Sequence, residues 1–447
     1  MHIGIFGHYG NQNLGDEAII EAAIDSVRRH FGEPDISCFS IRPEDTAERH
    51  GVPAYPIIQR DEPSGGTRED EQDSDGRSEA PTAPAPSRPP GGPPSGPLGD
   101  LVRAIKGFRL VRLPYRALSG CLGLARALRS EIPFLLASYR RLKGVDLLIV
   151  AGSNQFLDNF GGVMGFPATL LKWSILCKLA RTKLAFVSVG AGPINSSLSK
   201  FLIRLSLRFA DYLSYRDVAS RELIEGSSRK FGGKVYPDLA SNLRFTVAET
   251  APRDPGKPTV GINPMPMYDS RYWCEADDRR YRAYVEKLAR FAVLLRDRDF
   301  PVFFFGTQKK DYDAVDDVLK HLPREDAAPA NGTLVRDATS VQDLMRIISS
   351  SDIVVATRFH GTVLSLVADV PVFGICYYRK AADLLREMDQ GEYFVMLDDF
   401  DVEEAFGKFL SLAANLEQEK WKIHETSAKY HELVEQQYEH LASMFSQ

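Results

Sequence analysis

The sequence predicts an α/β protein built from two parallel-sheet domains. At 447 residues the chain is too long for a single compact hydrophobic core, so two domains are expected. Short apolar runs alternate with helical patterns along most of the chain, which is typical of βαβ units. The segment "RDPGKP" at residues 253 to 258 has the composition of a linker and separates two such series. Each series is therefore expected to form one parallel sheet.

The expected strands can be followed in order. In the first series they are "HIGIF", "DISCFSI", "DLLIVAG", "KLAFVSVG", "DYLSYR" and "KVYPD". In the second series they are "TVGINP", "PVFFFG", "GTLV", "DIVVAT" and "PVFGICYY". We expect an N-terminal domain over residues 1–252 and a C-terminal domain over residues 253–400, followed by helices without a further strand over residues 401–447.

Residues 61–100 interrupt the first series. This segment holds nine prolines and seven glycines, and its only large aliphatic side chain is Leu98. Such a composition cannot bury enough apolar surface to offset the entropy lost on ordering. Because strand patterns of one series lie on both sides, we expect a disordered insert within the N-terminal domain.

Residues 101–143 follow with ten Lys or Arg against one acidic residue, Glu131. Two interpretations remain open. The segment can form ordinary surface helices whose arginines extend away from an apolar face. It can also be a basic amphipathic surface that contacts an anionic membrane or a lipid-linked substrate. We favour the first because arginine-rich helices are common on ordinary surfaces; the second predicts peripheral membrane contact through residues 101–143.

Composition and charge exclude several classes of protein. The formal charge of −5 gives no general argument for a nucleic-acid partner, and none is expected. The five cysteines lie far apart without a histidine cluster, which favours reduced thiols over disulfides and predicts no metal site. The chain starts with an apolar strand pattern, and no uninterrupted apolar run approaches the roughly 20 residues of a spanning helix. We expect a cytoplasmic protein.

Cationic side chains follow two strands of the second series. Arg358 and His360 come after "DIVVAT", Gly361 leads into a helix, and Lys380 follows the next strand. In open parallel sheets ligands bind beyond the carboxyl ends of the strands, and a helix start offers free N–H groups to an anion. These residues predict a pocket for a small polyanion, with one histidine to move a proton. The alternative is that Arg358 pairs with a carboxylate and His360 only caps the helix.

The first strand is followed by a similar strand–loop–helix pattern. "IFGHYGNQNLGDEAI" places Asn13, Gly15, Asp16 and Glu17 at the helix start, with a glycine spacing unlike that of nicotinamide-binding loops. Asp16 can be an N-cap and Glu17 a carboxylate favoured by the helix dipole. Asp16 can equally face the cleft and accept a proton from a hydroxyl. These two interpretations of Asp16 remain open.

Other strand ends carry weaker signals. They are Ser153 and Asn154 in "AGSNQF", residues 190–195 in "GAGPIN", Arg216 and Asp217 in "YRD", Asp238 in "PDLA", and Gln308 and Asp311 in "FFGTQKKD". Among these, Arg216 is the strongest candidate for a second anion-binding arginine. The paired acids elsewhere occur in polar helical or turn contexts and are interpreted as solvated faces.

Taken together, "NxGDEAI", "GAGPI", "YRDVAS", "YPDLA" and "RFHGTVLSLVADVPVFGICYYRK" resemble the polysaccharide pyruvyltransferase family. The resemblance covers most of the chain outside residues 61–140. It implies two Rossmann-like domains facing a cleft, as in the glycosyltransferase-B type. It also implies transfer of the enolpyruvyl group of phosphoenolpyruvate onto a sugar, usually as a ketal across two hydroxyls, in cell-surface polysaccharide synthesis.

The resemblance also implies residue roles. Arg216 and Arg358 would bind the anionic groups of the donor, assisted by the backbone around Phe359, His360 and Gly361. His360 would be the general acid that protonates the C3 methylene, and Lys380 would stabilise the departing phosphate. The acceptor sugar would be bound by Asn13, Gly15, Asp16, Ser153 and Asn154, with Asp16 as the second catalytic residue. No cofactor is implied beyond phosphoenolpyruvate as donor substrate.

One departure leaves other functions open. After "LLIVAG" the family usually has a run of glycines, whereas this chain has "GSNQF", which narrows the loop at Ser153 and Asn154. A nucleotide-sugar glycosyltransferase of the same fold is one alternative, with Asp383 as the carboxylate for ribose hydroxyls. A non-catalytic protein that binds a glycan or an anion is another. The expected partners are phosphoenolpyruvate and a glycan or lipid-linked sugar, at the inner face of the membrane or in the cytoplasm.

Overall fold

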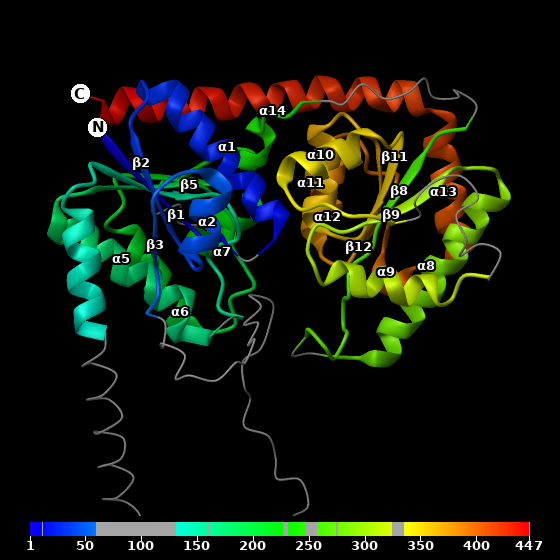
Figure 1. Ribbon diagram of the computed structural model, residues 1–447, viewed down its shortest axis with the longest axis horizontal. Helices are drawn as coiled ribbons and strands as arrows, with labels where there is room; N and C mark the ends of the chain where they lie inside the picture. Colours follow the sequence, from blue (N-terminus) through cyan, green and yellow to red (C-terminus); the bar gives the residue numbers. More distant parts are fainter. Residues whose placement is uncertain are drawn as a thin grey trace, which may run out of the picture.

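The computed structural model describes residues 1–10, 12–59, 131–159, 161–226, 231–246, 257–273, 276–323 and 335–446. Within them the chain forms two parallel β-sheets side by side, each covered by helices (Figure 1). The predicted α/β class with two parallel-sheet domains is confirmed. The expected disordered insert, residues 61–100, and residues 101–130 of the basic segment lie outside the described residues.

The N-terminal sheet has seven strands in the order β3-β2-β1-β4-β5-β6-β7. The strands are β1 (His2–Phe6), β2 (Asp35–Ser40), β3 (Ala54–Pro56), β4 (Leu147–Ala151), β5 (Lys183–Val189), β6 (Tyr212–Tyr215) and β7 (Lys234–Val235). The helices are α1 (Leu14–Phe31), α2 (Pro43–His50), α5 (Phe166–Ala180), α6 (Ser197–Leu207) and α7 (Val218–Glu225), with 3-10 helices η1 (Gly162–Met164) and η3 (Leu239–Asn242). A further helix covers residues 131–142.

The strands of this sheet alternate their side chains between two apolar cores. Ile3 and Ile5 of β1 belong to a core shared with α1, whereas Leu148 and Val150 of β4 belong to a core shared with α5 and α6. This period of two follows from the pleat of a strand and explains why both central strands are apolar throughout. Helices α1 and α5 therefore lie on opposite faces of the sheet.

The C-terminal sheet has six strands in the order β10-β9-β8-β11-β12-β13. The strands are β8 (Val260–Asn263), β9 (Val302–Phe305), β10 (Val335–Arg336), β11 (Ile353–Ala356), β12 (Val372–Cys376) and β13 (Phe394–Met396). The helices are α8 (Asp278–Asp297), α9 (Asp311–Leu319), α10 (Val341–Ser349), α11 (Phe359–Val367), α12 (Arg379–Glu387), α13 (Val402–Ala414) and α14 (Leu416–Phe445), with the 3-10 helix η4 (Leu397–Asp399).

Both sheets reverse their strand order at one position. In the N-terminal sheet the chain order changes direction between β1 and β4, and in the C-terminal sheet between β8 and β11. At such a switch point the loops after the two strands diverge and leave a crevice at the carboxyl edge. The loops after β1, β4 and β11 carry most of the site residues that the sequence predicted, while Arg216 and Lys380 follow β6 and β12.

The last helix returns to the N-terminal domain. α14 has 30 residues, which is about 45 Å of helix, and it runs along both domains (Figure 1). Arg29 of α1 forms an ion pair with Glu435 at 2.6 Å, and Gln437 donates a hydrogen bond to Ser214 of β6 at 2.6 Å. Apolar residues of α1, α11 and α14 belong to one core cluster. The two domains therefore share part of their packing.

Every strand expected from the sequence overlaps an observed strand, and residues 401–446 are helical as expected apart from short connections. Two strands were not expected, β3 and β13. Each has three residues and lies at the edge of its sheet, where pairing on one side alone determines its conformation. Pro53 and Pro56 interrupt the run around β3, which argues against a strand. The run "YFVML" around β13 is too short for periodicity to separate a strand from a helix.

Candidate functional site

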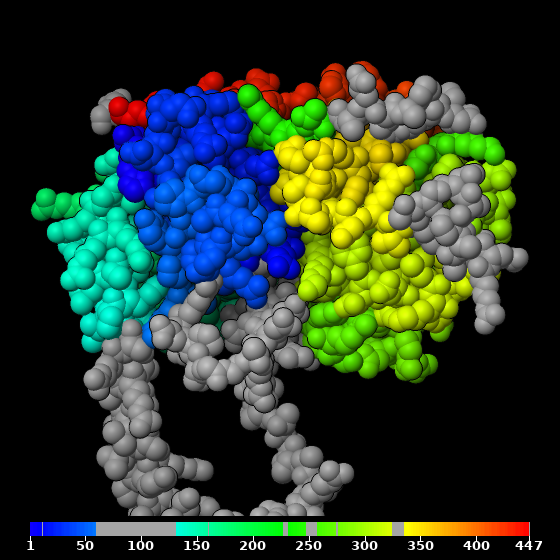
Figure 2. Space-filling view, in the orientation of Figure 1, coloured from blue at the N-terminus to red at the C-terminus, as the bar shows by residue number. Residues whose placement is uncertain are grey.

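The carboxyl edges of the two sheets meet at the start of α1. The amide of Leu14 donates a hydrogen bond to the carbonyl of Thr307 at 3.0 Å, and Asn13 forms an isolated antiparallel bridge with Gln308. Figure 2 shows the blue N-terminal residues directly against the yellow residues of the C-terminal domain. The loops after β1 and β9 are therefore in contact across the domain boundary.

A hydrogen-bond network fixes Asp16 at this boundary. Asn13 is the N-cap of α1, and its side-chain oxygen accepts from the amide of Gly15 at 3.1 Å. Its Nδ2 donates to Asp16 Oδ2 at 2.8 Å, and the hydroxyl of Ser153 donates to Asp16 Oδ1 at 2.8 Å. Asn13, not Asp16, caps the helix, so the N-cap interpretation of Asp16 is wrong. The carboxylate is instead held between the loops after β1 and β4, at the N-terminal switch point.

The imidazole ring of His360 packs directly against the backbone of Gly15. A Cβ atom on residue 15 would overlap the imidazole ring of His360, so only glycine allows this approach of α11 to α1. Phe359 lies beside it, with the two ring centroids 5.6 Å apart. Two residues predicted from opposite ends of the sequence, Gly15 and His360, are thus in contact, and Asp16 is the next residue along α1.

Arg358 is held inside the C-terminal domain. Its Nε donates to Asp311 Oδ1 at 2.7 Å, and its Nη2 lies 2.6 Å from the same oxygen. Asp311 is fully buried, and its Oδ2 accepts from the amide and hydroxyl of Thr307 and from the amide of Gln308. The guanidinium is therefore oriented by a buried ion pair, in agreement with the alternative that Arg358 pairs with a carboxylate. The helix start at Gly361 is equally tight, since a Cβ there would overlap Asn263 Oδ1.

Arg216 and Lys380 come from opposite domains. The guanidinium of Arg216 donates to Asp238 at 3.0 Å and stacks over the Phe359 ring at 4.9 Å from its centroid. The ammonium of Lys380 donates to Asn154 Oδ1 at 3.0 Å and to the Ala191 carbonyl at 2.5 Å. Lys380 of α12 thus reaches across to the loops after β4 and β5 of the N-terminal domain.

Burial and neighbouring charges shift the pKa values of Lys380 and Asp217. Burial, reinforced by the positive charge of Arg216, lowers the pKa of Lys380 to about 7, against the opposing effect of Asp217. Burial opposes ionisation of Asp217, yet the charges of Arg216 and Lys380 and the hydrogen bond from Ser220 hold its pKa below the ordinary value. Lys380 is therefore close to changing its charge at neutral pH.

A cavity of about 460 Å³ lies between the domains at this point. Of the residues expected to bind donor or acceptor, Arg216, Phe359 and Lys380 line it and the others do not. Its remaining lining is largely apolar, includes residues of α12 and α14, and carries five carboxylates: Asp217, Glu222, Asp238, Asp383 and Glu387. Asp217, Asp238 and Asp383, the ribose carboxylate of the alternative function, are therefore also at the cavity. The predicted residues therefore divide into a cavity group and a domain-contact group made of Asn13, Gly15, Asp16, Ser153 and His360. Asn154 joins the two groups through its hydrogen bond to Lys380.

Sequence reasoning missed part of the cavity wall. Ser427, Tyr430 and Leu433 of α14 line it, and no pattern in residues 401–447 distinguishes them from an ordinary amphipathic helix. Glu387 of α12 also lines it and accepts a hydrogen bond from Tyr430 at 3.0 Å. Burial raises the pKa of Glu387. The return of α14 onto the N-terminal domain brings these residues together.

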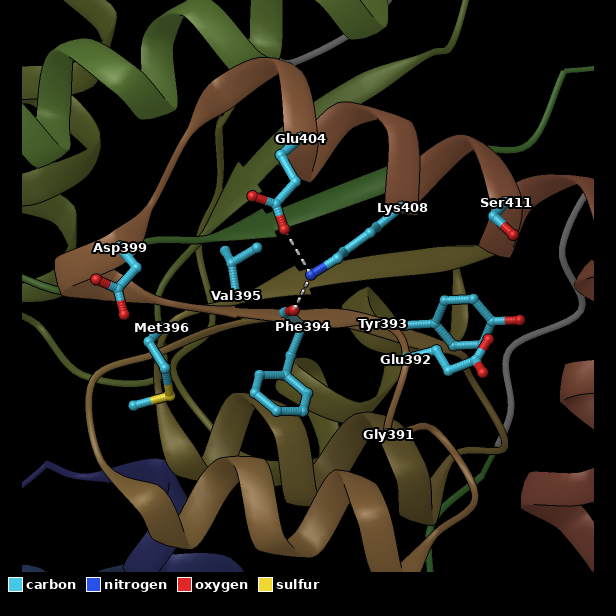
Figure 3. Close-up of a pocket in the computed structure, with 10 residues that line it drawn as sticks. All are labelled: Gly391, Glu392, Tyr393, Phe394, Val395, Met396, Asp399, Glu404, Lys408 and Ser411. Carbon is cyan, nitrogen blue, oxygen red and sulfur yellow. Dashed lines mark hydrogen bonds and ion pairs between the residues drawn. The ribbon is translucent and has the colours of Figure 1, made fainter.

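A second cavity, of about 540 Å³, lies beside the edge strand β13 and helix α13. Figure 3 shows Lys408 extending from α13 between Glu404 and the carbonyl of Phe394, at 2.9 and 3.5 Å. It contains none of the predicted site residues and lies at the edge of the sheet away from the switch point. Lys408 covers an exposed strand edge, a common protection against unwanted strand pairing. The cavity between the domains is the better candidate site.

Metal ligands do not gather in the described part of the chain. There, no group of three or more His, Cys, Asp or Glu side chains has the arrangement of a metal site. The described site offers the cations of Arg216 and Lys380, the imidazole of His360 and the carboxylate of Asp16.

Comparison with known proteins gives a family and a fold. A family model described as polysaccharide pyruvyl transferase matches residues 13–378. No curated protein matches the chain. Among solved structures, Anabaena Alr3699/HepE in complex with UDP and glucose is similar, with a TM-score of 0.53, 12% identity, and coverage of 99% of this chain and 98% of that one.

Two further structures are similar over nearly their whole length. S. aureus MnaA, solved with UDP, has a TM-score of 0.54, 8% identity, and coverage of 96% of this chain and 92% of that one. A glycosyltransferase from Rickettsia africae has a TM-score of 0.54, 10% identity, and coverage of 100% and 98%. At such low identity these likenesses show the two-domain fold of the glycosyltransferase-B type and nothing about the ligand.

Proposed function

The chain belongs to the polysaccharide pyruvyl transferase family, and we propose that its donor is phosphoenolpyruvate and its product a pyruvate ketal on a glycan or sugar intermediate. Membership makes it a transferase with a role in polysaccharide synthesis. The donor, the ketal and a cytoplasmic location are the proposed part. The proposed acceptor is a glycan or a lipid-linked sugar.

One observation carries the proposal: cations from both domains line a single cavity. Arg216 of the N-terminal domain and Lys380 of the C-terminal domain both line the 460 Å³ cavity. Phosphoenolpyruvate carries a phosphate and a carboxylate on three carbons, so it needs cations on more than one side. Each cation donates a hydrogen bond to a protein oxygen, Arg216 to Asp238 and Lys380 to Asn154. These bonds hold both side chains in place without a ligand.

The proposed reaction assigns the remaining residues. Phe359 lines the cavity and His360 is its neighbour at the start of α11, so the proposal places the donor at the edge of the cavity beside His360. His360 gives a proton to the C3 methylene of the donor, which makes C2 electrophilic. A sugar hydroxyl adds to C2 and loses its proton to Asp16, whose orientation is fixed by Asn13 and Ser153. The C2–O bond to phosphate then breaks beside Lys380, and the departing phosphate takes the proton held by Asp16. A second hydroxyl adds to C2 and gives its proton to His360, which closes the ketal and restores both residues. The contact of His360 with Gly15 supports this arrangement because it brings the acid next to Asp16.

The role of Arg358 in the proposal is narrower than the resemblance implied. Its Nε and Nη2 bind the buried Asp311, and Arg358 is not among the residues that line the cavity. We therefore propose that Arg358 fixes the start of α11, and with it Phe359 and His360, while Arg216 and Lys380 bind the donor. An ion pair buried on both sides is a device for positioning more than for ligand binding.

Calorimetric titration with phosphoenolpyruvate tests the donor assignment. We expect heat of binding with the native chain and its loss in Lys380→Ala. Arg379→Ala is the matched control, because Arg379 is the exposed neighbour at the start of the same helix and does not line the cavity. The control should bind like the native chain. Equal losses in both variants would mean that general electrostatic attraction, and not the cavity, binds the donor.

The volume of the cavity favours a second candidate donor, a nucleotide sugar, which the same calorimetric experiment can test. About 460 Å³ is more than a three-carbon acid fills and falls in the range of ordinary small-molecule sites. UDP occupies two of the similar structures. A titration with UDP in parallel distinguishes the two donors: heat with UDP and none with phosphoenolpyruvate would replace the proposal with a nucleotide-sugar glycosyltransferase.

A further inference from the structure

One face of the N-terminal domain carries several exposed large apolar side chains. It consists of the helix at residues 131–142, η1, α5 and α6, which we call the outer face. Seven large apolar side chains on it are exposed by 41 to 81%: Ile132, Leu136, Met164, Ile175, Leu179, Leu198 and Phe201. They make up half of the fourteen exposed large apolar side chains in the described part of the chain. An exposed apolar concentration of this kind marks an interaction surface.

The helices of the outer face form one continuous layer. Lys172 of α5 forms an ion pair with Glu131 at 2.5 Å and lies over the ring of Phe134 at 5.3 Å, which joins α5 to the helix at residues 131–142. α5 also packs against α6, and α6 against η1. These helices cover the face of the sheet opposite to α1, while α14 lies against the α1 side. Figure 1 shows the helix at residues 131–142 and α5 on the side of the N-terminal domain away from the C-terminal domain, and α6 at the lower end of the domain.

The outer face is also positively charged. Residues 161–210 contain seven Lys or Arg and no Asp or Glu, in a chain whose formal charge is −5. Arg181 and Arg208 are exposed at the ends of α5 and α6. Lys178 and Lys183 share one carboxylate, Asp211, at 3.7 and 3.4 Å, so they outnumber their acidic partner. Apolar side chains surrounded by cations are complementary to a bilayer that carries anionic headgroups.

A membrane-spanning role does not fit this layer. The described residues contain one helical stretch long and apolar enough to cross a bilayer, Gly162–Ala180, and 39% of it is buried in the protein. Leu170, Trp173 and Cys177 of this stretch belong to the domain core, and the Trp173 indole donates to the carbonyl of Ile57 at 2.9 Å. Extracting the helix would expose that core. Only its other side, with Ile175 and Leu179, is available to lipid.

We propose that the outer face binds the surface of an anionic lipid bilayer, with the exposed apolar side chains of α5, α6 and the helix at residues 131–142 entering the headgroup region. A second copy of the chain is a poorer occupant, because a symmetric contact would oppose two faces of the same positive charge. Leu198 and Phe201 lie in the first turns of α6, directly after the loop whose Ala191 carbonyl accepts from Lys380. Membrane binding through this face therefore brings the bilayer to the end of the domain that carries the cleft. The proposal stands on the surface alone and does not depend on the donor.

Vesicle sedimentation of the full chain tests the proposal. We expect the native chain to sediment with phosphatidylcholine vesicles that contain phosphatidylglycerol, to remain in solution with phosphatidylcholine alone, and to be released by salt. The double variant Leu198→Ser, Phe201→Ser should reduce the bound fraction by about tenfold, because exposed apolar side chains enter the bilayer. Trp421→Ser is the matched control: Trp421 is 64% exposed on α14, away from the outer face, and its loss should change nothing.

Two outcomes would overturn the proposal. One is the absence of native chain from the pellet of anionic vesicles, and the other is equal sedimentation of the double variant and the native chain. Light scattering after gel filtration adds a third: a native dimer that the double variant dissociates would assign the face to self-association. If the double variant fails to fold by circular dichroism, Lys178→Gln with Arg181→Gln probes the same face through its charge and should also weaken binding.

Discussion

Two arginines follow strands of different domains and behave differently. Arg358 follows β11 and is enclosed with Asp311, whose side chain is fully buried. Arg216 follows β6 and is paired with Asp238, but it lines the interdomain cavity together with that carboxylate. Both were predicted as anion-binding residues from the same sequence feature. A cation at the end of a strand can therefore line a ligand cavity or fix the position of a helix. The difference depends on whether its carboxylate partner lies at the cavity or inside the domain.

The largest expected effect separates the two arginines by stability. Arg358→Met should lower the free energy of unfolding by about 3–5 kcal/mol, because it leaves the buried Asp311 charge without its partner. Arg216→Met should cost less, since water in the cavity can reach Asp238. Urea unfolding of the two variants beside the native chain measures the difference. Equal losses of unfolding free energy in the two variants would show that water reaches Asp238 in the cavity no better than it reaches Asp311 in the interior.

Ligand binding should reverse that order. Arg216→Met removes a charge-assisted contact and should weaken phosphoenolpyruvate binding by about 1.5–3 kcal/mol, roughly 10- to 150-fold. Arg358→Met, examined where it remains folded, should weaken binding less, because its effect reaches the cavity only through the position of α11. Calorimetry measures both. A greater loss of affinity in Arg358→Met would return Arg358 to the donor site.

The pH dependence of binding sharpens the assignment of the cavity. Lys380 has a pKa of about 7, so its ammonium is present below that pH and is lost above it. Anion binding should therefore weaken as pH rises through 7, by about tenfold for the charge of one side chain. The measurement is affinity against pH for the native chain and for Lys380→Met, which should lose this part of the dependence while retaining the titration of the ligand itself. A variant with the native pH profile would exclude Lys380 as its source.

Lys380 also makes stability depend on pH, with a defined sign. Its pKa is lowered on folding, so between about 7 and the ordinary value of 10.5 the unfolded chain binds the proton and the folded chain does not. Folding stability from this group should rise with pH across that interval. Unfolding at two pH values within it, compared with Lys380→Met, detects the slope.

The smallest expected effect concerns the group of residues outside the cavity. Ser153→Ala removes the hydrogen bond from its hydroxyl to Asp16 and should cost about 0.5–1.5 kcal/mol of stability. Donor binding should stay unchanged, because neither residue lines the cavity. Thermal unfolding and calorimetry on the same variant measure the two quantities. A clear loss of donor affinity would show that the domain-contact group takes part in donor binding.

Much of the fold and part of the site follow from local sequence patterns. Apolar runs with helices between them predict parallel sheets, and parallel sheets gather the ends of their strands at one edge. Arg216, Lys380, Asp16 and His360 could be proposed on that basis because each follows a strand. Edge strands β3 and β13 were missed, because prolines interrupt the run around β3 and the run around β13 is too short to separate a strand from a helix.

The sequence by itself determined the elements, their order and the chemistry at the strand ends, because these depend on neighbours within a few residues. Only the tertiary structure decided the partners. Asp311 and Arg358 are 47 residues apart and meet through the order of β9, β8 and β11. Gly15 meets His360 through the contact of two domains, and α14 reaches the cavity by returning along both. Such pairings depend on how the sheets are wound and packed, and no local periodicity records that arrangement.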